Sequence, residues 1–395
     1  MESIIFHIDV NSAYLSWSAV DRLRSGETID IREISSAIGG DEESRRGVVL
    51  AKSNKAKAYG IITGESLYSA KKKCKDLMII PPNFKIYEEY SKMLMTFLYN
   101  YTPYLQQYSI DECFLDMGKI SRDEALMLGE SIRKEINIKL GFTVSIGIST
   151  NKLLAKMASE LKKPNKVNTI FKEEVKDKLW HLPVEELFMV GKSAKKKLNS
   201  MYIFTIGELA NYDRDIIKER LKSSGELIWN YANGIDDSRV NYNEDSIKNI
   251  SNEVTLPMDI MRKEKAYKVL LEVAEQVAYR LRKNQKYCYS IGVNIKTNEF
   301  KSYSHQKRLS NPTDSTNVIS ETVLELFSIY WKGEPIRLLG ITLSNLTDTY
   351  TEQLSLFSLE TSKKAESSEK LDKTLDEIRE KYGKNIICRT SLLKK

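Results

Sequence analysis

Cysteine and histidine are scarce in this sequence, and neither type is clustered. The chain of 395 residues has 4 Cys and 3 His, and these residues lie far apart from one another. Disulfide frameworks and tetrahedral zinc sites both require several such residues at short, regular spacing. The sequence therefore excludes both as organising features, and the scarcity of cysteine is typical of a reducing compartment.

Long apolar runs are also absent, and so is any bias toward glycine or proline. No stretch reaches the roughly 18 apolar residues of a membrane span. The amino terminus, MESIIFHIDV, lacks both a basic segment and a cleavage site. With 18 Gly and 8 Pro, the chain is neither collagen-like nor of low complexity. We expect an untargeted, soluble, cytoplasmic protein without a membrane partner.

The composition supports two or three globular domains and a basic surface. Hydrophobic residues make up 41% of the chain and charged residues 29%, and a domain has roughly 150 residues. The net charge of +7 is concentrated: residues 261–308 hold 12 Lys or Arg against 4 acidic residues, and residues 152–197 hold 12 Lys against 6. Such blocks are typical of nucleic-acid binding, although solvated lysine faces on ordinary helices explain either block alone equally well.

Hydrophobic periodicity in the first half predicts strand, helix, two strands joined by a turn near residue 110, helix and strand. This order is the split βαβ, or ferredoxin-like, arrangement. The supporting segments are residues 4–8, 87–101, 114–115, 128–136 and 144–148. About 70 residues interrupt the arrangement after the first strand, and we expect this insertion to be a small helical subdomain.

The same order of elements recurs between residues 250 and 343. Between the two arrangements lies a region with a helical pattern, residues 168–236. A polar tract without periodicity, residues 237–248, follows and resembles a tether. After residue 348 comes a polar tail with a helical run at residues 371–378. We therefore expect two βαββαβ units on either side of a helical middle.

Three carboxylates are expected to meet at one edge of the first sheet. Asp9 ends the first strand, and Asp111 and Glu112, in the segment YSIDECFLD, lie at the turn between two central strands. Such hard oxygen ligands hold Mg²⁺, and two ions can clamp the attacking and leaving oxygens of a phosphoryl displacement. Because consecutive strand residues point to opposite faces, both turn residues can face a metal only if the hairpin bends. The alternative is a solvated turn that is acidic.

Two further segments carry side chains suited to a nucleotide. Tyr14 follows Asp9 by five positions and would lie beside a nucleotide sugar, unless it is a packing tyrosine. In ISTNKLLAKMASELKKPNK, residues 148–166, Lys163 precedes a proline and would contact phosphate. The alternative for this residue is one more solvated lysine.

Two short segments suggest macromolecular partners. In MVGKSAKKKL, Gly191 precedes a lysine-rich helix, as in helix-hairpin-helix elements that donate backbone N–H groups to a DNA phosphate. A plain helix start is the alternative. QLSLF, residues 353–357, is a short apolar segment in a polar tail, which can bind a groove on a partner. A terminal strand packed on its own domain is the alternative there.

A GGDE tetrapeptide, the signature of diguanylate cyclases, occurs within residues 38–44. Those enzymes also use a palm-like sheet. Here Glu43 stands where the signature requires Phe, and the segment lies outside the predicted sheet. A nucleotide cyclase is therefore only an alternative hypothesis.

Taken together, these segments resemble the motifs of the Y-family (UmuC/DinB-like) translesion DNA polymerases, in the same order. The segments are DVNSAY, YSIDECFLD, STNKLLAKMAS with KKPNK, VGKSAKKKL and QLSLF. The resemblance covers almost the whole chain, and YSIDE with the downstream KPN is a specific pair. It implies an α+β right-hand polymerase with a ferredoxin-like palm, small fingers, a helical helix-hairpin-helix thumb and a second βαββαβ domain, the little finger.

The resemblance also implies domain bounds and metal ligands. The expected bounds are 1–12 and 80–167 for the palm, 13–79 for the fingers, 168–236 for the thumb, 237–248 for a linker, 249–348 for the little finger and 349–395 for the tail. The expected catalytic metal ligands are Asp9, Asp111 and Glu112, with the carbonyl of Val10 as a further ligand.

Other roles are implied for the nucleotide pocket. Tyr14 resembles the steric gate that stacks under the deoxyribose and excludes a 2′-OH, and Lys163 resembles the palm lysine that contacts the triphosphate. The fingers depart from the usual pattern, because Asn54 stands at a tyrosine position and Lys57 at an arginine position. Lys57 can act as a point charge on phosphate but lacks the bidentate fork of arginine. Ala13 is smaller than the aromatic residue often found before the gate.

Contacts with macromolecules follow from the same resemblance. The thumb residues expected to bind DNA are Gly191, Lys192, Lys195 and Lys196. The residues expected to bind the sliding clamp are Gln353, Leu354, Ser355, Leu356 and Phe357. With primer-template DNA and a dNTP, these complete the expected partners of a monomeric protein that is associated with the nucleoid when it acts.

The implied activity is template-directed nucleotidyl transfer with two Mg²⁺ ions, which Mn²⁺ can replace. The primer 3′-OH attacks the α-phosphorus of a dNTP, and pyrophosphate leaves. Low fidelity without proofreading is expected, because no second carboxylate cluster suggests a nuclease, and the implied setting is DNA repair in the SOS response. A catalytically silent DNA-binding accessory protein and a palm-type nucleotide cyclase are the alternatives.

Overall fold

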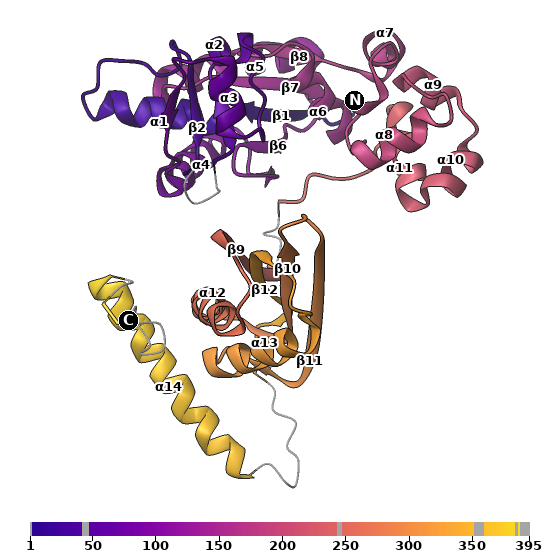
Figure 1. Ribbon diagram of the computed structural model, residues 1–395. Helices are drawn as coiled ribbons and strands as arrows, with labels where there is room; N and C mark the ends of the chain where they lie inside the picture. The colour runs from indigo at the N-terminus through magenta and orange to yellow at the C-terminus, as the bar shows by residue number, and fades with distance from the viewer. Residues whose placement is uncertain (1, 42–46, 243–246, 351–358, 384–385, 388–395) are drawn as a thin grey trace. The chain divides into compact units, whose positions relative to one another are not determined.

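The chain divides into two compact units, with the division after residue 244 (Figure 1). The computed structural model describes residues 2–41, 47–242, 247–350, 359–383 and 386–387, and it leaves the side chains of residues 359–370 undescribed. Within these residues, no helix combines the length and the apolar character needed to cross a membrane.

A five-stranded sheet, here called the palm sheet, forms the centre of the amino-terminal unit. Its strands, in spatial order, are β5 (Leu105–Gln107), β6 (Glu112–Asp116), β1 (Ile5–Val10), β7 (Val144–Ser149) and β8 (Val167–Thr169). Strand β1 is antiparallel to both of its neighbours, whereas β7 and β8 run parallel. With the helices between the strands, this is the ferredoxin-like arrangement that periodicity predicts.

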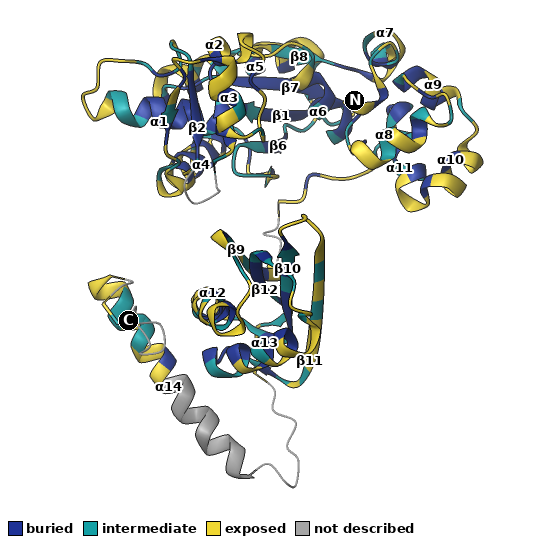
Figure 2. Cartoon of the chain, in the orientation of Figure 1, coloured by how far each residue is buried: buried dark blue, intermediate teal, exposed yellow. Residues whose placement is uncertain are grey.

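Side chains of β1 alternate between the two faces of the palm sheet. Phe6, Ile8 and Val10 lie in a buried core with α4 (Phe84–Leu98) and α5 (Arg122–Leu140). His7 and Asp9 face the other side, which is covered by α6 (Lys152–Leu161). Figure 2 shows β1 and β7 as largely buried. The palm sheet therefore carries an apolar face and a face with ionisable groups.

Helix α6 lies very close to β7. A Cβ atom added to Gly147 would stand 1.9 Å from the carbonyl oxygen of Ala155. Only glycine permits this approach of two backbones. The close packing holds α6, and with it the side chains at its carboxyl end, at a fixed height over β1.

The insertion after β1 contains a second sheet, so the expectation of a purely helical subdomain was wrong. Its strands, in spatial order, are β3 (Val49–Lys52), β2 (Ser36–Gly39) and β4 (Met78–Ile80), accompanied by α2 (Asn54–Ala58) and α3 (Leu67–Lys73). Strands of three or four residues are too short to show alternation in a sequence. Helix α1 (Ala13–Arg24) serves both sheets, because Trp17 lies in the palm core and Leu15 in a cluster with Ile38 of β2.

The region after β8 is helical, as predicted. Its α-helices are α7 (Val175–Leu179), α8 (Lys192–Asn199), α9 (Ile206–Asn211), α10 (Arg214–Leu221) and α11 (Ser223–Ala232), with 3-10 turns η1 (Lys172–Glu174) and η2 (Val184–Glu186). Leu154 and Met157 of α6 share a buried core with these helices. The same helix thus packs on the palm sheet and on the helical region.

The tract predicted as a tether is partly packed. Val240 is buried in a cluster with Phe114 of β6. The Leu153 N–H donates to Asp236 Oδ2 at 3.0 Å, and the Asn241 N–H donates to Gln106 Oε1 at 3.0 Å. Residues 236–242 are therefore held against the palm.

The carboxy-terminal unit is built on the second βαββαβ arrangement, which confirms that prediction. Its elements are β9 (Asn249–Ile260), α12 (Lys263–Lys283), β10 (Tyr287–Thr297), β11 (Ser302–Thr313), α13 (Thr316–Tyr330) and β12 (Ile336–Thr347). The sheet has the order β11-β10-β12-β9, and its core lies under α12 and α13.

The predicted helical run in the tail belongs to α14 (Leu359–Tyr382). This helix contacts the second unit through buried ion pairs. The guanidinium of Arg282 in α12 pairs with Asp376 at 2.6 Å and with Asp372 at 3.4 Å. Asp372 also accepts the Thr316 N–H of α13 at 2.8 Å. The second half of α14, residues 371–382, is therefore part of the carboxy-terminal unit.

Candidate active site

The register between β1 and β6 places two of the predicted carboxylates side by side. Asp9 is the direct partner of Glu112, and residues directly opposite in a sheet point to the same face. That face lies under α6. The side chains of Asp9 and Glu112 are 16% and 14% exposed, so both carboxylates are largely removed from water.

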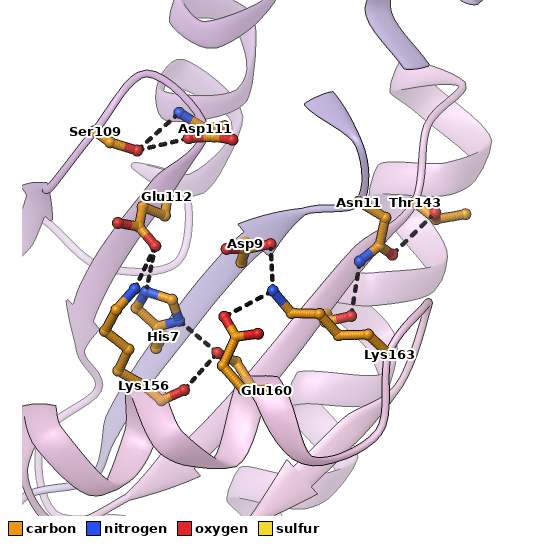
Figure 3. Close-up of polar contacts among 12 residues, drawn as sticks. His7, Asp9, Asn11, Ser109, Asp111, Glu112, Thr143, Lys156, Glu160 and Lys163 are labelled. Carbon is orange, nitrogen blue, oxygen red and sulfur yellow. Dashed lines mark hydrogen bonds and ion pairs between the residues drawn. The ribbon is translucent and has the colours of Figure 1, made fainter. Parts of the chain in front are cut away.

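Each carboxylate has its own cationic partner from α6 or the loop that follows it (Figure 3). The Lys156 ammonium lies 2.6 Å from Glu112 Oε2. The Lys163 ammonium lies 2.9 Å from Asp9 Oδ1 and 2.8 Å from Glu160 Oε1. Burial of a carboxylate is tolerated when it is paired in this way.

The two carboxylates have different proton affinities. Burial raises the pKa of Asp9 to about 6, against the opposing charge of Lys163, and Glu160 and Asp111 add to the rise. Burial also acts to raise the pKa of Glu112, but the hydrogen bonds from His7 and Lys156 outweigh it and lower that pKa to about 2. Glu112 is therefore ionised at neutral pH, and Asp9 is the more easily protonated of the pair.

Asp111 lies just before β6, where the chain bends at residues 109–111. Its carboxylate accepts a hydrogen bond from Ser109 Oγ at 2.6 Å, and its carbonyl accepts the Val10 N–H at 3.0 Å. Consecutive residues of a regular strand point to opposite faces, so Asp111 and Glu112 can face the same ligand only if the chain bends at this point, as it does here. Asp111 raises the pKa of Asp9, so its charge is felt at the pair.

The loop after α6 is tied to the end of β1. The Asn165 N–H donates to Asn11 Oδ1 at 2.8 Å, and Thr143 donates to the same oxygen at 3.1 Å. The Asn11 amide donates in turn to Ser145 at 2.8 Å. These contacts fix the loop that carries Lys163 relative to Asp9.

Tyr14 lies in the first turn of α1, directly after the strand that carries Asp9. It is half-buried, and its ring stacks on Tyr87 of α4 with 4.6 Å between ring centroids. Burial is the main cause that raises the pKa of Tyr14, and the charge of Asp111 adds to it. Tyr14 is therefore within electrostatic reach of the carboxylates.

The structure thus gathers six of the predicted residues at one end of the palm sheet: Asp9, Val10, Asp111, Glu112, Tyr14 and Lys163. The remaining predicted residues lie elsewhere. Lys57 is exposed on α2, and Gly191 precedes α8, with Lys192 and Lys196 exposed on that helix and Lys195 paired with Glu185 at 2.6 Å. Residues 353–357 lie outside the described part of the chain.

Sequence reasoning missed His7, which lies beside the carboxylates. This buried side chain has Nε2 3.3 Å from Glu112 Oε2 and Nδ1 2.8 Å from Ser159 Oγ. Burial lowers the pKa of His7, against the effect of Glu112, which acts to raise it. The available signal was its position two residues before Asp9, because alternate residues of a strand share a face.

The donor chemistry fits a hard divalent cation. Asp9, Asp111 and Glu112 offer only carboxylate oxygens, which are the preferred ligands of Mg²⁺. In the described residues, no three His, Cys, Asp or Glu side chains are grouped closely enough to hold a metal ion. The Ser109 hydroxyl donates a hydrogen bond to the Asp111 carboxylate. The ammonium groups of two lysines balance the charges of Glu112 and Asp9. A metal would therefore replace these contacts.

Comparison with known proteins gives a family for the whole chain. The impB/mucB/samB family matches residues 8–160, and its C-terminal domain matches residues 247–356. The DNA polymerase IV of Clostridium acetobutylicum is 54% identical over 396 residues, which cover 100% of this chain and 99% of that protein. The DNA polymerase IV of Clostridium kluyveri is 37% identical over 404 residues, with coverage of 100% and 99%.

The fold agrees with that of a solved Y-family DNA polymerase, a chimera of Dbh and Dpo4. The TM-score is 0.76 at 20% identity, with 88% of this chain and 100% of the other covered. This likeness concerns the fold, whereas the two full-length relatives carry the sequence likeness. The chain therefore belongs to the impB/mucB/samB family, the UmuC/DinB-like Y-family DNA polymerases.

Proposed function

We propose that the protein is a translesion DNA polymerase that adds deoxynucleotides to a primer 3′-OH under the direction of a template. The observation that carries this proposal is the pairing of Asp9 with Glu112 across adjacent strands, with Asp111 at the bend beside them. The family excludes the two alternatives, a silent accessory protein and a cyclase.

Y-family DNA polymerases use divalent metal ions, and we take Mg²⁺ as the ion here. Asp9, Asp111 and Glu112 would hold it, with the Val10 carbonyl as a further ligand. The bound ions would supply charge neutralisation of the triphosphate and activation of the primer oxygen. The residues of the chain do the rest by positioning and by electrostatics, which dominate phosphoryl transfer.

Lys163 is the candidate triphosphate contact from the palm. In the present arrangement its ammonium is shared between Asp9 and Glu160. With a dNTP bound, the Lys163 ammonium would turn to the phosphates while the loop stays anchored through Asn165 and Asn11. Tyr14 would lie under the sugar, and Lys57 would add a point charge from α2.

DNA and the clamp are the proposed macromolecular partners. A Cβ added to Gly191, at the start of α8, would meet no atom within 4 Å, which leaves room there for a phosphate to approach, and Lys192 and Lys196 are exposed beside it. QLSLF, residues 353–357, is proposed to bind the sliding clamp. We propose a monomer that acts on DNA in the bacterial cytoplasm.

Extension of a labelled primer on undamaged and abasic templates tests this proposal. Asp111→Asn keeps the size of the side chain but removes its charge, and we expect extension to fall at least about 100-fold. Asp123→Asn, at an exposed position on α5, is the matched control and should extend like the wild type. Equal extension by Asp111→Asn and the wild type would contradict the assignment, and failure to pass the abasic site would contradict lesion bypass.

A further inference from the structure

Tyr14 is part of a compact group of aromatic rings contributed by two helices. Its ring stacks on Tyr87 with 4.6 Å between centroids and 18° between planes. Phe84 meets both rings edge-on, at 6.0 Å from Tyr14 and 5.8 Å from Tyr87, each at 82°. Offset stacks and edge-to-face contacts are the favourable geometries for aromatic pairs. The ring of Tyr14 is therefore held on more than one side.

Tyr87 cannot give way behind Tyr14. Its side chain is 0% exposed, and its hydroxyl lies 3.0 Å from the Ser18 hydroxyl of α1. The hydrogen bond joins α4 to the helix that carries Tyr14 and fixes the Tyr87 ring relative to that helix. Because Tyr87 covers the inner side of Tyr14, a nucleotide can meet only the side of Tyr14 that is turned away from the core.

Phe84 is the first residue of α4 and is 54% exposed. A large apolar side chain with this exposure contributes little to the core, yet its edge rests against Tyr14. Ala13, directly before Tyr14, is buried and supplies no ring of its own. Lateral support of Tyr14 therefore comes from Phe84 of α4 and from Trp17 of α1, whose ring centroid lies 6.3 Å from that of Tyr14.

Steric selection of a sugar requires a ring that does not yield. A 2′-hydroxyl is excluded only if moving the ring by a fraction of an ångström is unfavourable, and close-packed surroundings resist such a movement. We propose that Phe84 and Tyr87 are positioning residues that hold Tyr14 rigid and so set the preference for deoxynucleotides over ribonucleotides. This inference rests on the proposed function, in which Tyr14 lies under the sugar.

The ratio of kcat/KM for a dNTP to kcat/KM for the matching rNTP measures this preference. Phe84→Ala removes the edge contact at an exposed position, so the protein should fold as the wild type does. We expect the ratio to fall about two- to tenfold, the range that an aromatic pair contributes, because rNTP insertion rises. Insertion of dNTP should stay near the wild-type value.

Two further variants separate support of the ring from general effects of the substitution. Tyr99→Ala, at the other end of α4 with 53% exposure, removes an aromatic ring of similar exposure away from Tyr14 and should leave the ratio unchanged. Phe84→Tyr keeps the ring and should restore the wild-type ratio. A loss of helix stability would instead affect Tyr99→Ala and Phe84→Ala alike.

The outcomes distinguish this inference from the function on which it rests. If Tyr14→Ala loses selectivity while Phe84→Ala keeps the wild-type ratio, the supporting role of α4 is overturned and the gate stands. If Tyr14→Ala itself keeps the ratio, the gate is overturned and the inference falls with it. If the wild type extends no primer with dNTPs, the proposed function is what fails.

Discussion

Lys156 and Lys163 come from the same short stretch of chain but act on different carboxylates. They lie seven positions apart, and Lys156 is within α6 whereas Lys163 is in the loop after it. Lys156 keeps Glu112 ionised with the help of His7, whereas Lys163 is shared between Asp9 and Glu160. At the residue scale, the site therefore combines Glu112, which two partners keep ionised, with Asp9, whose lysine partner can move to another acceptor.

Lys57 is the residue at which a gain of function is expected. A lysine contacts a phosphate as a point charge, whereas arginine can donate two parallel hydrogen bonds. We expect Lys57→Arg to lower the KM for dNTP about two- to fivefold without a change in DNA affinity. Steady-state insertion kinetics measures this effect.

Lys55→Arg is the matched control for that variant, because Lys55 lies on the same short helix and is also exposed. It should leave the KM unchanged. If both variants, or neither, lower the KM, Lys57 does not contact the triphosphate specifically.

At the scale of elements, α14 is the feature that periodicity only partly revealed. The sequence predicts a helical run near residues 371–378, but its partners lie about 60 to 100 residues earlier in α12 and α13. Arg379 extends the contact by pairing with Glu275 at 3.0 Å. No local sequence pattern indicates which distant arginine will form an ion pair with a given aspartate.

Asp372→Asn tests whether these contacts stabilise the carboxy-terminal unit. The substitution removes a charge that is 6% exposed and leaves Arg282, 8% exposed, with Asp376 as its remaining ion pair. We expect the free energy of unfolding to fall by about 2 kcal/mol, the contribution of a hydrogen-bonded charged group. Urea titration of the full chain, followed through the transition of this unit, measures the change.

Glu377→Gln is the control on the same helix, since Glu377 is exposed. A change at such a surface position stays within about 0.5 kcal/mol. Equal loss of stability in the two variants would show that the Arg282 contacts do not anchor α14.

The fingers show the opposite case, in which elements were missed. Strands β2, β3 and β4 pair only through residues brought together from positions 36 to 80. The parallel pairing of β2 with β4 requires a long crossover connection between the two strands. A short window of sequence therefore does not show which strands will pair. The insertion was predicted to be a small helical subdomain, and α2 and α3 are the helices that it contains between β3 and β4.

At the scale of the molecule, the basic residues of the block at residues 261–308 lie on both sides of the carboxy-terminal sheet. Lys265 lies on α12, while Arg308 lies on β11 opposite Ser290. Ser290 precedes Ile291, whose side chain is in the core under the helices, so Ser290 and Arg308 lie on the side of the sheet that faces away from the helices. This sheet side can approach DNA, whereas the helix side cannot do so at the same time.

Arg308→Ser is expected to weaken DNA binding for all sequences alike and to reduce the slope of log K against log salt by about 1, the loss of one phosphate contact. Fluorescence anisotropy with a labelled primer-template at several salt concentrations measures both quantities. Lys265→Ser makes the same change of charge on the helix side and should leave the slope unchanged. Equal slopes for all three proteins would contradict DNA binding by this side of the sheet.

The order of elements and the metal-binding residue types follow from the sequence alone. Alternation and helical spacing are local, so two βαββαβ arrangements, the helical middle and the acidic turn at Asp111 and Glu112 are visible without coordinates. The resemblance of short motifs adds the family, and the full-length relatives confirm it.

Tertiary structure alone decided which groups meet. The β1–β6 register sets Asp9 against Glu112, the close approach of α6 brings Lys156 to Glu112 and Ser159 to His7, and α4 brings a stack of rings to Tyr14. These contacts join residues between 44 and 152 positions apart, among them Lys156 with Glu112 and His7 with Ser159. Hydrophobic periodicity reports only which face of an element is buried. The proton affinities and the rigidity of the site depend on which other element packs against that face.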